Sequence, residues 1–159
     1  MSIILDATNG ITTPEVFAVN GVSGTPCFSA YQSTAQLALV PNTWTRVSLQ
    51  TKEFDTTSAF DNVTNFRFQP TVAGYYWIFG SVQVQTATSS ITSGIYKNGA
   101  LFKAGLVVSN SQFGSVVSSL INLNGSTDYI EFWTNSSVAN LIISQVTNTY
   151  FQGFLARAL

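Results

Sequence analysis

The sequence predicts an all-β protein, a β-sandwich of jelly-roll type. Segments with the two-residue alternation of a β-strand recur along the chain, and turn residues separate them roughly every 8–12 positions. No stretch of about ten or more residues places apolar side chains at the spacing of an amphipathic helix. The 159 residues are enough for one domain with its own core.

The first 25 residues differ from the rest of the chain, with two short apolar segments around the turn signal Asn9-Gly10 and too few apolar side chains for a core of their own. We predict an extended arm over residues 1–25 and a sandwich domain over residues 26–159. An extended segment gains hydrogen bonds by adding to an exposed sheet edge, so the arm would anchor to a partner or intertwine with sister chains. A loosely docked terminus is the alternative. The anchoring side chains would be Ile3, Leu5, Ile11, Val16, Phe17 and Val19.

The sandwich domain is expected to open with a strand at residues 27–31, followed by an alternating segment at 43–50. Residues 53–65 are expected to be mostly loop, with Phe54 and Phe60 anchored in the sandwich, and Lys97-Asn98-Gly99 is a hairpin signal. The later strands are expected at 92–96, 100–103, 106–108, 115–123, 129–133, 141–146 and 149–159, and polar loops at 86–90, 109–114 and 135–140.

The strand expected at residues 75–85 is apolar on both faces in its first half. Pro70 ends the strand before it, and Ala73-Gly74 is expected to supply the turn. One face suits a core, and Gly80 leaves a gap there for a bulky neighbour. A strand of a two-layer sandwich needs only one apolar face, so a neighbouring subunit is expected to cover the other. The core face has Tyr76, Ile78, Val82 and Val84, and the opposite face has Tyr75, Trp77 and Phe79.

The residue inventory argues against an enzyme. The chain has no histidine, which removes the commonest general base and metal ligand, and nothing activates the single Cys27. Glu53, Asp55 and Asp61 could gather around a calcium ion, but their spacing matches no calcium loop, which favours a solvated loop. A glycosidase would need a pair of carboxylates, and nothing in the sequence locates one. We therefore predict no catalytic residue, no metal site and no cofactor.

Low charge also excludes some partners. Only 8% of residues are charged and the net charge is −1, so we expect no binding to nucleic acid. No apolar run approaches the ~20 residues that cross a bilayer, so we expect no membrane insertion. Trp44, Trp77 and Trp133 could be sugar-stacking platforms, but packing in the core or at a subunit seam is the favoured interpretation.

Several short motifs, in the expected order, resemble the C1q/TNF-like jelly-roll family over residues 27–159. The central one is a Phe-x-x-Pro-x-x-Gly-Tyr-Tyr-x-Phe pattern with a one-residue departure in spacing at its first Phe. It stands here as Phe68, Pro70, Gly74, Tyr75, Tyr76 and Ile78-Phe79. Residues 27–31 resemble the family's opening strand, residues 95–99 its mid-chain hairpin and residues 151–155 its closing strand. Residues 4–14, ILDATNGITTP, resemble N-terminal segments of bacteriophage tail-fibre and virion surface proteins.

The resemblance implies a homotrimer in which the inner sheets pack about a three-fold axis. Together with the phage-like arm, it suggests a virion surface protein made in the host cytoplasm. A trimeric capsid decoration or cement protein, gripping the major capsid protein with its arm, is favoured because only about 25 residues precede the domain. The tip of a tail fibre that binds a host glycan or protein receptor is the alternative. A secreted C1q-like module is disfavoured by the missing signal peptide and collagen repeat. The trimer interface would use Tyr75, Trp77, Phe79, Tyr150 and Phe154.

Overall fold

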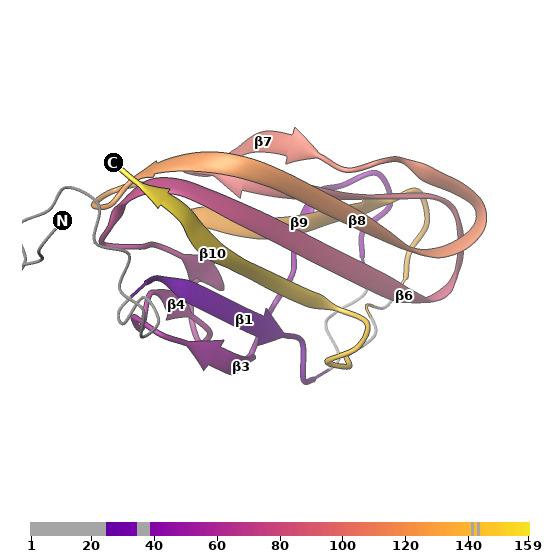
Figure 1. Cartoon of the computed structure of the whole chain (residues 1–159). Helices are drawn as coiled ribbons and strands as arrows, with labels where there is room; N and C mark the ends of the chain where they lie inside the picture. The colour runs from indigo at the N-terminus through magenta and orange to yellow at the C-terminus, as the bar shows by residue number, and fades with distance from the viewer. Residues whose placement is uncertain (1–24, 35–38, 141, 143) are drawn as a thin grey trace, which may run out of the picture.

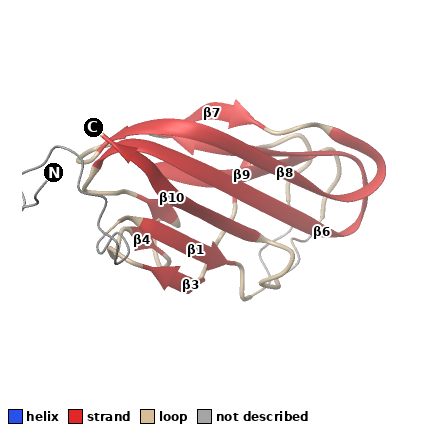
Figure 2. Ribbon diagram, viewed as in Figure 1, coloured by secondary structure: helices blue, strands red, loops and turns tan. Residues whose placement is uncertain are grey.

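The computed structural model describes residues 25–34, 39–140, 142 and 144–159, so the residues expected to anchor the predicted arm lie outside it. Every regular element in the described part is a strand, as the sequence predicts (Figure 2). The strands are β1 (Cys27–Tyr31), β2 (Thr45–Arg46), β3 (Thr51–Asp55), β4 (Phe60–Asp61), β5 (Arg67–Phe68), β6 (Ala73–Lys97), β7 (Ala100–Ala104), β8 (Val108–Asn124), β9 (Ile130–Ser136) and β10 (Tyr150–Ala158).

The strands form two antiparallel layers that share one long strand, β6 (Figure 1). The first half of β6 pairs with β10 on one side and β8 on the other, which gives a first sheet in the order β3-β1-β10-β6-β8. The end of β6 pairs with β9 and β7, and β9 continues to β5 and β4. β2 lies along the same edge of β9 as β5. This is the all-β sandwich that the sequence predicts.

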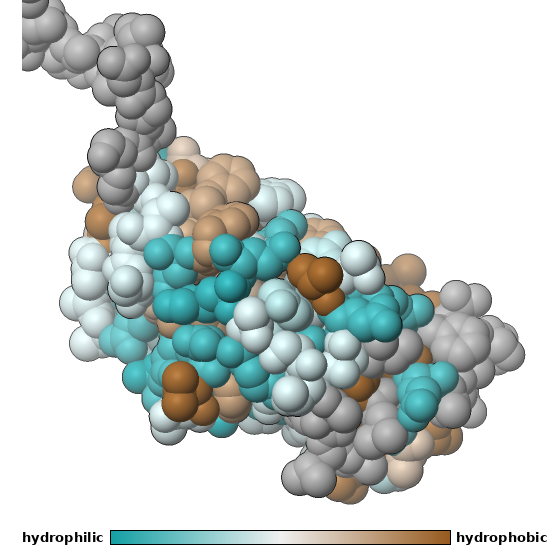
Figure 3. All heavy atoms as spheres, turned by 90° about the horizontal axis from the view of Figure 1, so that it is seen from below, coloured by the Kyte–Doolittle hydropathy of each residue, from teal (hydrophilic) through white to brown (hydrophobic). Residues whose placement is uncertain are grey.

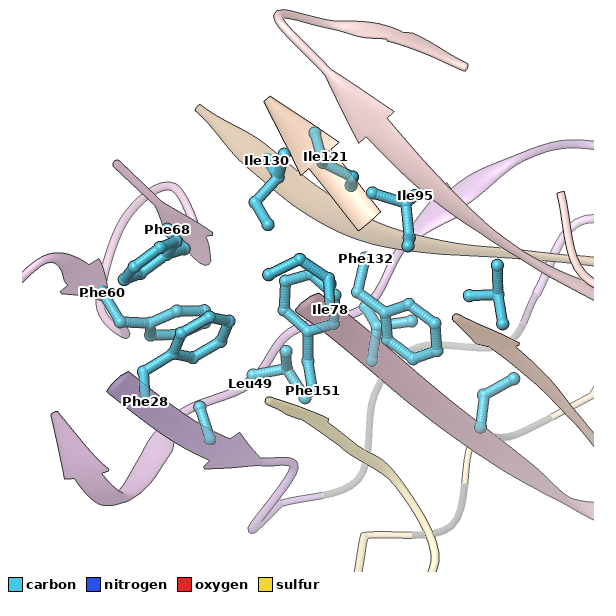
Figure 4. Packing of buried hydrophobic residues seen from close by; sticks show 14 of the residues in the cluster. Phe28, Leu49, Phe60, Phe68, Ile78, Ile95, Ile121, Ile130, Phe132 and Phe151 are labelled. Carbon is cyan, nitrogen blue, oxygen red and sulfur yellow. The ribbon is translucent and has the colours of Figure 1, made fainter. Parts of the chain in front are cut away.

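The core lies between the two sheets and is rich in phenylalanine (Figure 4). Phe28 of β1 stacks on Phe68 of β5 with ring centroids 4.2 Å apart, which joins the two layers at one end. Further along, Phe132 of β9 stacks on Phe151 of β10 with centroids 5.4 Å apart. Large aromatic side chains bury much apolar area each, so these cross-sheet pairs provide much of the packing that holds the layers together.

The core face of β6 is confirmed by its burial. Its four predicted core side chains are at most 1% exposed: Tyr76, Ile78, Val82 and Val84. The gap at Gly80 is also confirmed, because a Cβ atom added there would lie 2.7 Å from a ring carbon of Phe132. The aromatic ring of the facing sheet therefore occupies the space that a side chain at position 80 would need.

The hairpin between β6 and β7 is the predicted Asn-Gly turn. Lys97 pairs with Ala100, and the two residues between them have positive φ, 53° for Asn98 and 79° for Gly99. Two consecutive left-handed residues match the right-handed twist of the flanking strands, which is why Asn-Gly is favoured here.

Three sequence predictions about loops are wrong. Residues 86–90 and 109–114 are not loops, because β6 and β8 pair with each other there, for example Ser90 with Ser109. Ala73-Gly74 is not the turn before β6 but its first two residues, and Ala73 pairs with Asn124. The bend falls at residues 71–72. In each case backbone pairing with a partner strand outweighs the local preference of small polar residues for turns.

Residues 53–65 contain the end of β3 and the whole of β4, so they are less loop-like than predicted. Phe60 is buried at 3% exposure, as expected, but Phe54 is 48% exposed and does not enter the core. Phe54 pairs with Ser29 across the ladder, which points its side chain to the outer surface of the first sheet. In the segment expected as a strand at 141–146, the described part shows only an isolated bridge between Ile142 and Val84.

Candidate functional site

The outer surface of the first sheet carries a set of exposed or half-buried apolar side chains, which we call the apolar face. Alternation along each strand turns these side chains away from the core. The strands that provide them lie side by side in the order β3, β1, β10, β6 and β8 (Figure 1). The members of the apolar face are Phe54, Tyr75, Trp77, Phe79, Val116, Leu120, Tyr150 and Phe154.

Strand register brings these side chains together. Trp77 of β6 pairs with Phe154 of β10 on one side and with Leu120 of β8 on the other, so the three form a row across the sheet. The row is open to solvent, with Trp77 44%, Leu120 49% and Phe154 48% exposed. Next to the row, the rings of Phe79 and Tyr150 stack with centroids 5.7 Å apart. A rigid apolar surface of this kind marks a site of protein association more often than bulk surface does.

Three of the strands that carry this surface, β6, β8 and β10, are almost free of charge, whereas the edge strand β3 contains Lys52, Glu53 and Asp55. β8 contains no charged residue, β6 has none before Lys97, and β10 has none before Arg157. Burying the part of this surface on β6, β8 and β10 against a partner would therefore leave few charges without water. The side seen from below β1 and β3 is mixed, with hydrophilic and intermediate residues in its middle and hydrophobic residues among them and along its margins (Figure 3).

A cavity of about 390 Å³ opens on the apolar face between β1, β3, β6 and β10. Its walls include Phe54, Trp77, Phe79 and Phe154. Cys27 also lines it and is only partly buried. Burial raises the pKa of the Cys27 thiol, and the Asp55 carboxylate raises it further. The thiol therefore stays protonated at neutral pH and contributes to the wall as an apolar group.

The structure places the five residues of the predicted trimer interface on this one face. Sequence reasoning missed three other members. Val116 and Leu120 alternate with the polar Ser118 and Asn122 along β8, a pattern typical of an ordinary solvated strand face. Phe54 was missed because its segment was expected to be a loop. The only signal for Val116 and Leu120 in the sequence is that every second residue on this face of β8 is apolar.

The three carboxylates considered for calcium are each engaged in contacts within the protein. Asp55 pairs with Lys52 at 3.1 Å, and the Ser29 hydroxyl donates to Glu53 at 2.6 Å. Asp61 accepts hydrogen bonds from the backbone amides of residues 63–65. The amides of Thr64 and Val63 lower the pKa of Asp61 to about 2. No group of three or more possible metal ligands occurs among the described residues.

The carboxylates near β9 also have structural partners. Asp128 pairs with Lys97 at 2.9 Å, and hydrogen bonds from Asn98 and then Lys97 lower its pKa. Glu131 pairs with Arg46 at 3.1 Å and accepts a hydrogen bond from the indole Nε1 of Trp133 at 3.2 Å. Each of the two carboxylates is therefore held by an ion pair and hydrogen bonds of its own.

The three tryptophans lie in two different places. Trp133 stacks on Tyr96 with ring centroids 4.4 Å apart, and Trp44 meets the same ring edge-on at 5.8 Å. Both tryptophans therefore pack against the ring of Tyr96, on the outer surface of the second sheet. Trp77 is on the apolar face of the first sheet.

No helix in the described residues is long and apolar enough to span a bilayer.

Comparison with known proteins finds similarity of structure only. No protein-family model and no curated protein matches the sequence. Among solved structures, murine APRIL is 10% identical, with 82% of this chain and 98% of that chain covered at a TM-score of 0.65. The globular domain of zebrafish complement 1qA is 14% identical, with coverage of 85% and 99% and a TM-score of 0.64. PRD1 vertex protein P5 is 15% identical, with coverage of 86% and 99% and a TM-score of 0.63. The two-layer architecture and these matches agree: the described part of the chain has the C1q/TNF-like jelly-roll fold.

Proposed function

We propose that this protein is a non-enzymatic virion surface protein that assembles as a homotrimer through its apolar face. The observation that carries the proposal is the exposure of Trp77 and Phe154, at 44% and 48%, within a nearly uncharged sheet surface. Leaving this surface in water would be costly, because burial of apolar area stabilises by roughly 25 cal/mol per Å². A second and third copy of the chain supply the same apolar surface, which makes them suitable partners.

The resemblance of the chain to the C1q/TNF-like family favours three subunits, because it implies packing of the inner sheets about a three-fold axis. Residues 4–14 and the likeness in fold to a vertex protein both support a place on a virion. Within the virion we favour a capsid decoration or cement role, in which the arm of residues 1–25 binds the major capsid protein. The tip of a tail fibre, binding a host receptor or glycan, is the competing role.

The trimer is tested by replacing Trp77 with aspartate. A carboxylate at the centre of a buried apolar contact would lose its water without gaining a partner, at a cost of several kcal/mol. We expect Trp77→Asp to be a monomer when molar mass is measured by light scattering after gel filtration. The control is Val63→Asp, because Val63 is 78% exposed and lies outside the apolar face. This control should stay trimeric, and a soluble trimer of Trp77→Asp would contradict the proposed interface.

The virion role is tested separately from the trimer. Deleting residues 1–25 should leave a trimer that no longer binds the capsid, measured by co-sedimentation with particles that lack the protein. Imaging of the intact particle should show the trimers in fixed copy number over the shell. Trimers found only at the tail, with host-cell binding by the purified protein, would favour the fibre tip.

A further inference from the structure

A second, polar pocket lies at one end of the sandwich, formed by β4, β5 and parts of the β3–β4, β5–β6 and β8–β9 connections. Its volume is about 370 Å³, which is within the usual size range of small-molecule sites. None of its lining residues belongs to the apolar face, so the pocket stays open if that face is covered. We call it the Arg67 pocket, and its polar lining consists of Ser58, Asp61, Arg67, Gln69, Thr71 and Ser126.

The guanidinium of Arg67 is fixed in place before any ligand binds. It lies over the ring of Tyr129, 4.3 Å from the centroid, and donates from Nη2 to Oε1 of Gln69 at 3.0 Å. Gln69 in turn donates from Nε2 to the carbonyl of Ser126 at 3.0 Å. Within the described residues Arg67 makes no ion pair, in contrast to Arg46, Lys52 and Lys97. Its other N–H groups are therefore available to a ligand at little cost in ordering.

The pocket also contains one fixed negative charge. The Asp61 carboxylate accepts hydrogen bonds from three backbone amides and from Nδ2 of Asn65, and its pKa of about 2 keeps it ionised at neutral pH. Asp61 and Arg67 are cross-strand partners, so the two charges are close together. A pocket with one charge of each sign has almost no net charge and gives no electrostatic preference to a net anion or a net cation, so it suits an uncharged ligand that can both donate and accept hydrogen bonds.

The remaining wall provides hydroxyl groups and a small apolar area. The side chains of Ser58 and Thr71 make no hydrogen bond with other described residues, while Ala59 and Pro70 add carbon surface. The lining residue Ser58 has a positive φ of 55°, and Phe66, next to Arg67 in the chain, has one of 48°. Such conformations cost roughly 1–3 kcal/mol each and are concentrated at binding sites.

From this arrangement we propose that the Arg67 pocket binds a neutral saccharide unit. Sugar hydroxyls both donate and accept, so they match the guanidinium of Arg67 and the hydroxyls of Ser58 and Thr71 at the same time. The carbon face of a sugar ring would lie on Ala59 and Pro70. This binding does not depend on the proposed assembly, because the pocket is formed within one chain.

The test is a titration of the full-length protein with methyl glycosides of glucose, galactose and N-acetylglucosamine, followed by saturation-transfer NMR. We expect at least one of them to bind, and Arg67→Leu to weaken that binding at least about tenfold. The matched control is Lys103→Leu, which removes an exposed cation on β7, far from the pocket in sequence and outside its lining. Binding by this control should be unchanged.

A second variant keeps the test decisive if Arg67→Leu does not fold. Thr71→Val removes one exposed hydroxyl with little change of shape, and it should weaken binding about 2–10-fold. Binding of none of the three glycosides would overturn the proposal, as would binding that neither variant affects. Glucuronate and inorganic phosphate are the anionic probes, and preference for either over the neutral sugars would also contradict it.

Discussion

At the scale of single residues, Gly80 shows how closely the two sheets are packed. The ring of Phe132 fills the space where a side chain at position 80 would be. Two ring carbons of Phe132 lie less than 3.0 Å from an added Cβ, closer than side chains can approach without displacement. The glycine is therefore required by the aromatic ring of the opposite layer, not by its own backbone conformation.

We predict that Gly80→Ala lowers the free energy of unfolding by about 1–3 kcal/mol, the usual cost of overpacking a core. The change is measured by denaturant unfolding, with Thr64→Ala as the control. Thr64 is exposed and only its backbone amide is engaged, so the control should stay within about 0.5 kcal/mol of wild type. An unchanged stability of Gly80→Ala would show that Phe132 can move aside freely.

Asp61 gives a prediction for pH dependence. Its folded pKa of about 2 is below the usual value of about 3.9, because backbone amides stabilise its charged form. Its contribution to stability is therefore fully present above about pH 4 and is lost as the pH falls towards 2. We expect the difference in stability between wild type and Asp61→Asn to be constant above pH 4 and to shrink below it. A difference that stays constant down to about pH 2 would contradict this role.

The residue pattern of β6 was predictable from the sequence because strand alternation is a local property. Burial of Tyr76 and Ile78 and exposure of Tyr75 and Trp77 follow directly from it. The Arg67 pocket was not predictable, since its residues come from three separate segments: 58–61, 67–71 and 125–126. None of these segments contains a recognisable motif, and only the fold brings them together.

At the scale of elements, β6 and β8 are longer than local sequence indicates. Residues 86–90 are rich in Thr and Ser and were expected to form a loop, yet they continue the ladder. The pairing register nevertheless shifts between Gln83 and Thr88, and again between Thr88 and Ser90. The polar composition therefore has a visible effect, as irregular pairing in place of an open loop.

Amide hydrogen exchange should distinguish the regularly paired first half of β6 from the irregularly paired residues 88–90. Amides at residues 75–81 pair on both sides, with β8 and β10, and should exchange only with global unfolding. Amides at residues 88–90 lie at the register shifts and should exchange faster by at least about tenfold, through local opening. Exchange is measured by mass spectrometry or NMR. Equal protection in the two segments would contradict the predicted local opening at residues 88–90.

At the scale of the whole molecule, the nearly uncharged apolar face predicts how assembly responds to salt. Ion pairs weaken as salt shortens the Debye length from about 10 Å at 0.1 M to about 3 Å at 1 M, whereas apolar burial does not. We therefore expect the dissociation constant of the trimer to fall or stay constant between about 0.1 and 1 M NaCl. Sedimentation equilibrium measures this dissociation constant. Dissociation of the trimer at high salt would indicate an electrostatic interface instead.

The passage of β6 through both layers has a mechanical consequence. A load applied to the first sheet, for example by a swelling shell beneath a bound trimer, reaches the second sheet along covalent backbone as well as through core contacts. Pulling the layers apart along β6 would thus mean shearing β6 from its partners, which shares the force among many hydrogen bonds. The fold should resist tension along this strand far better than a sandwich whose layers meet only at side chains.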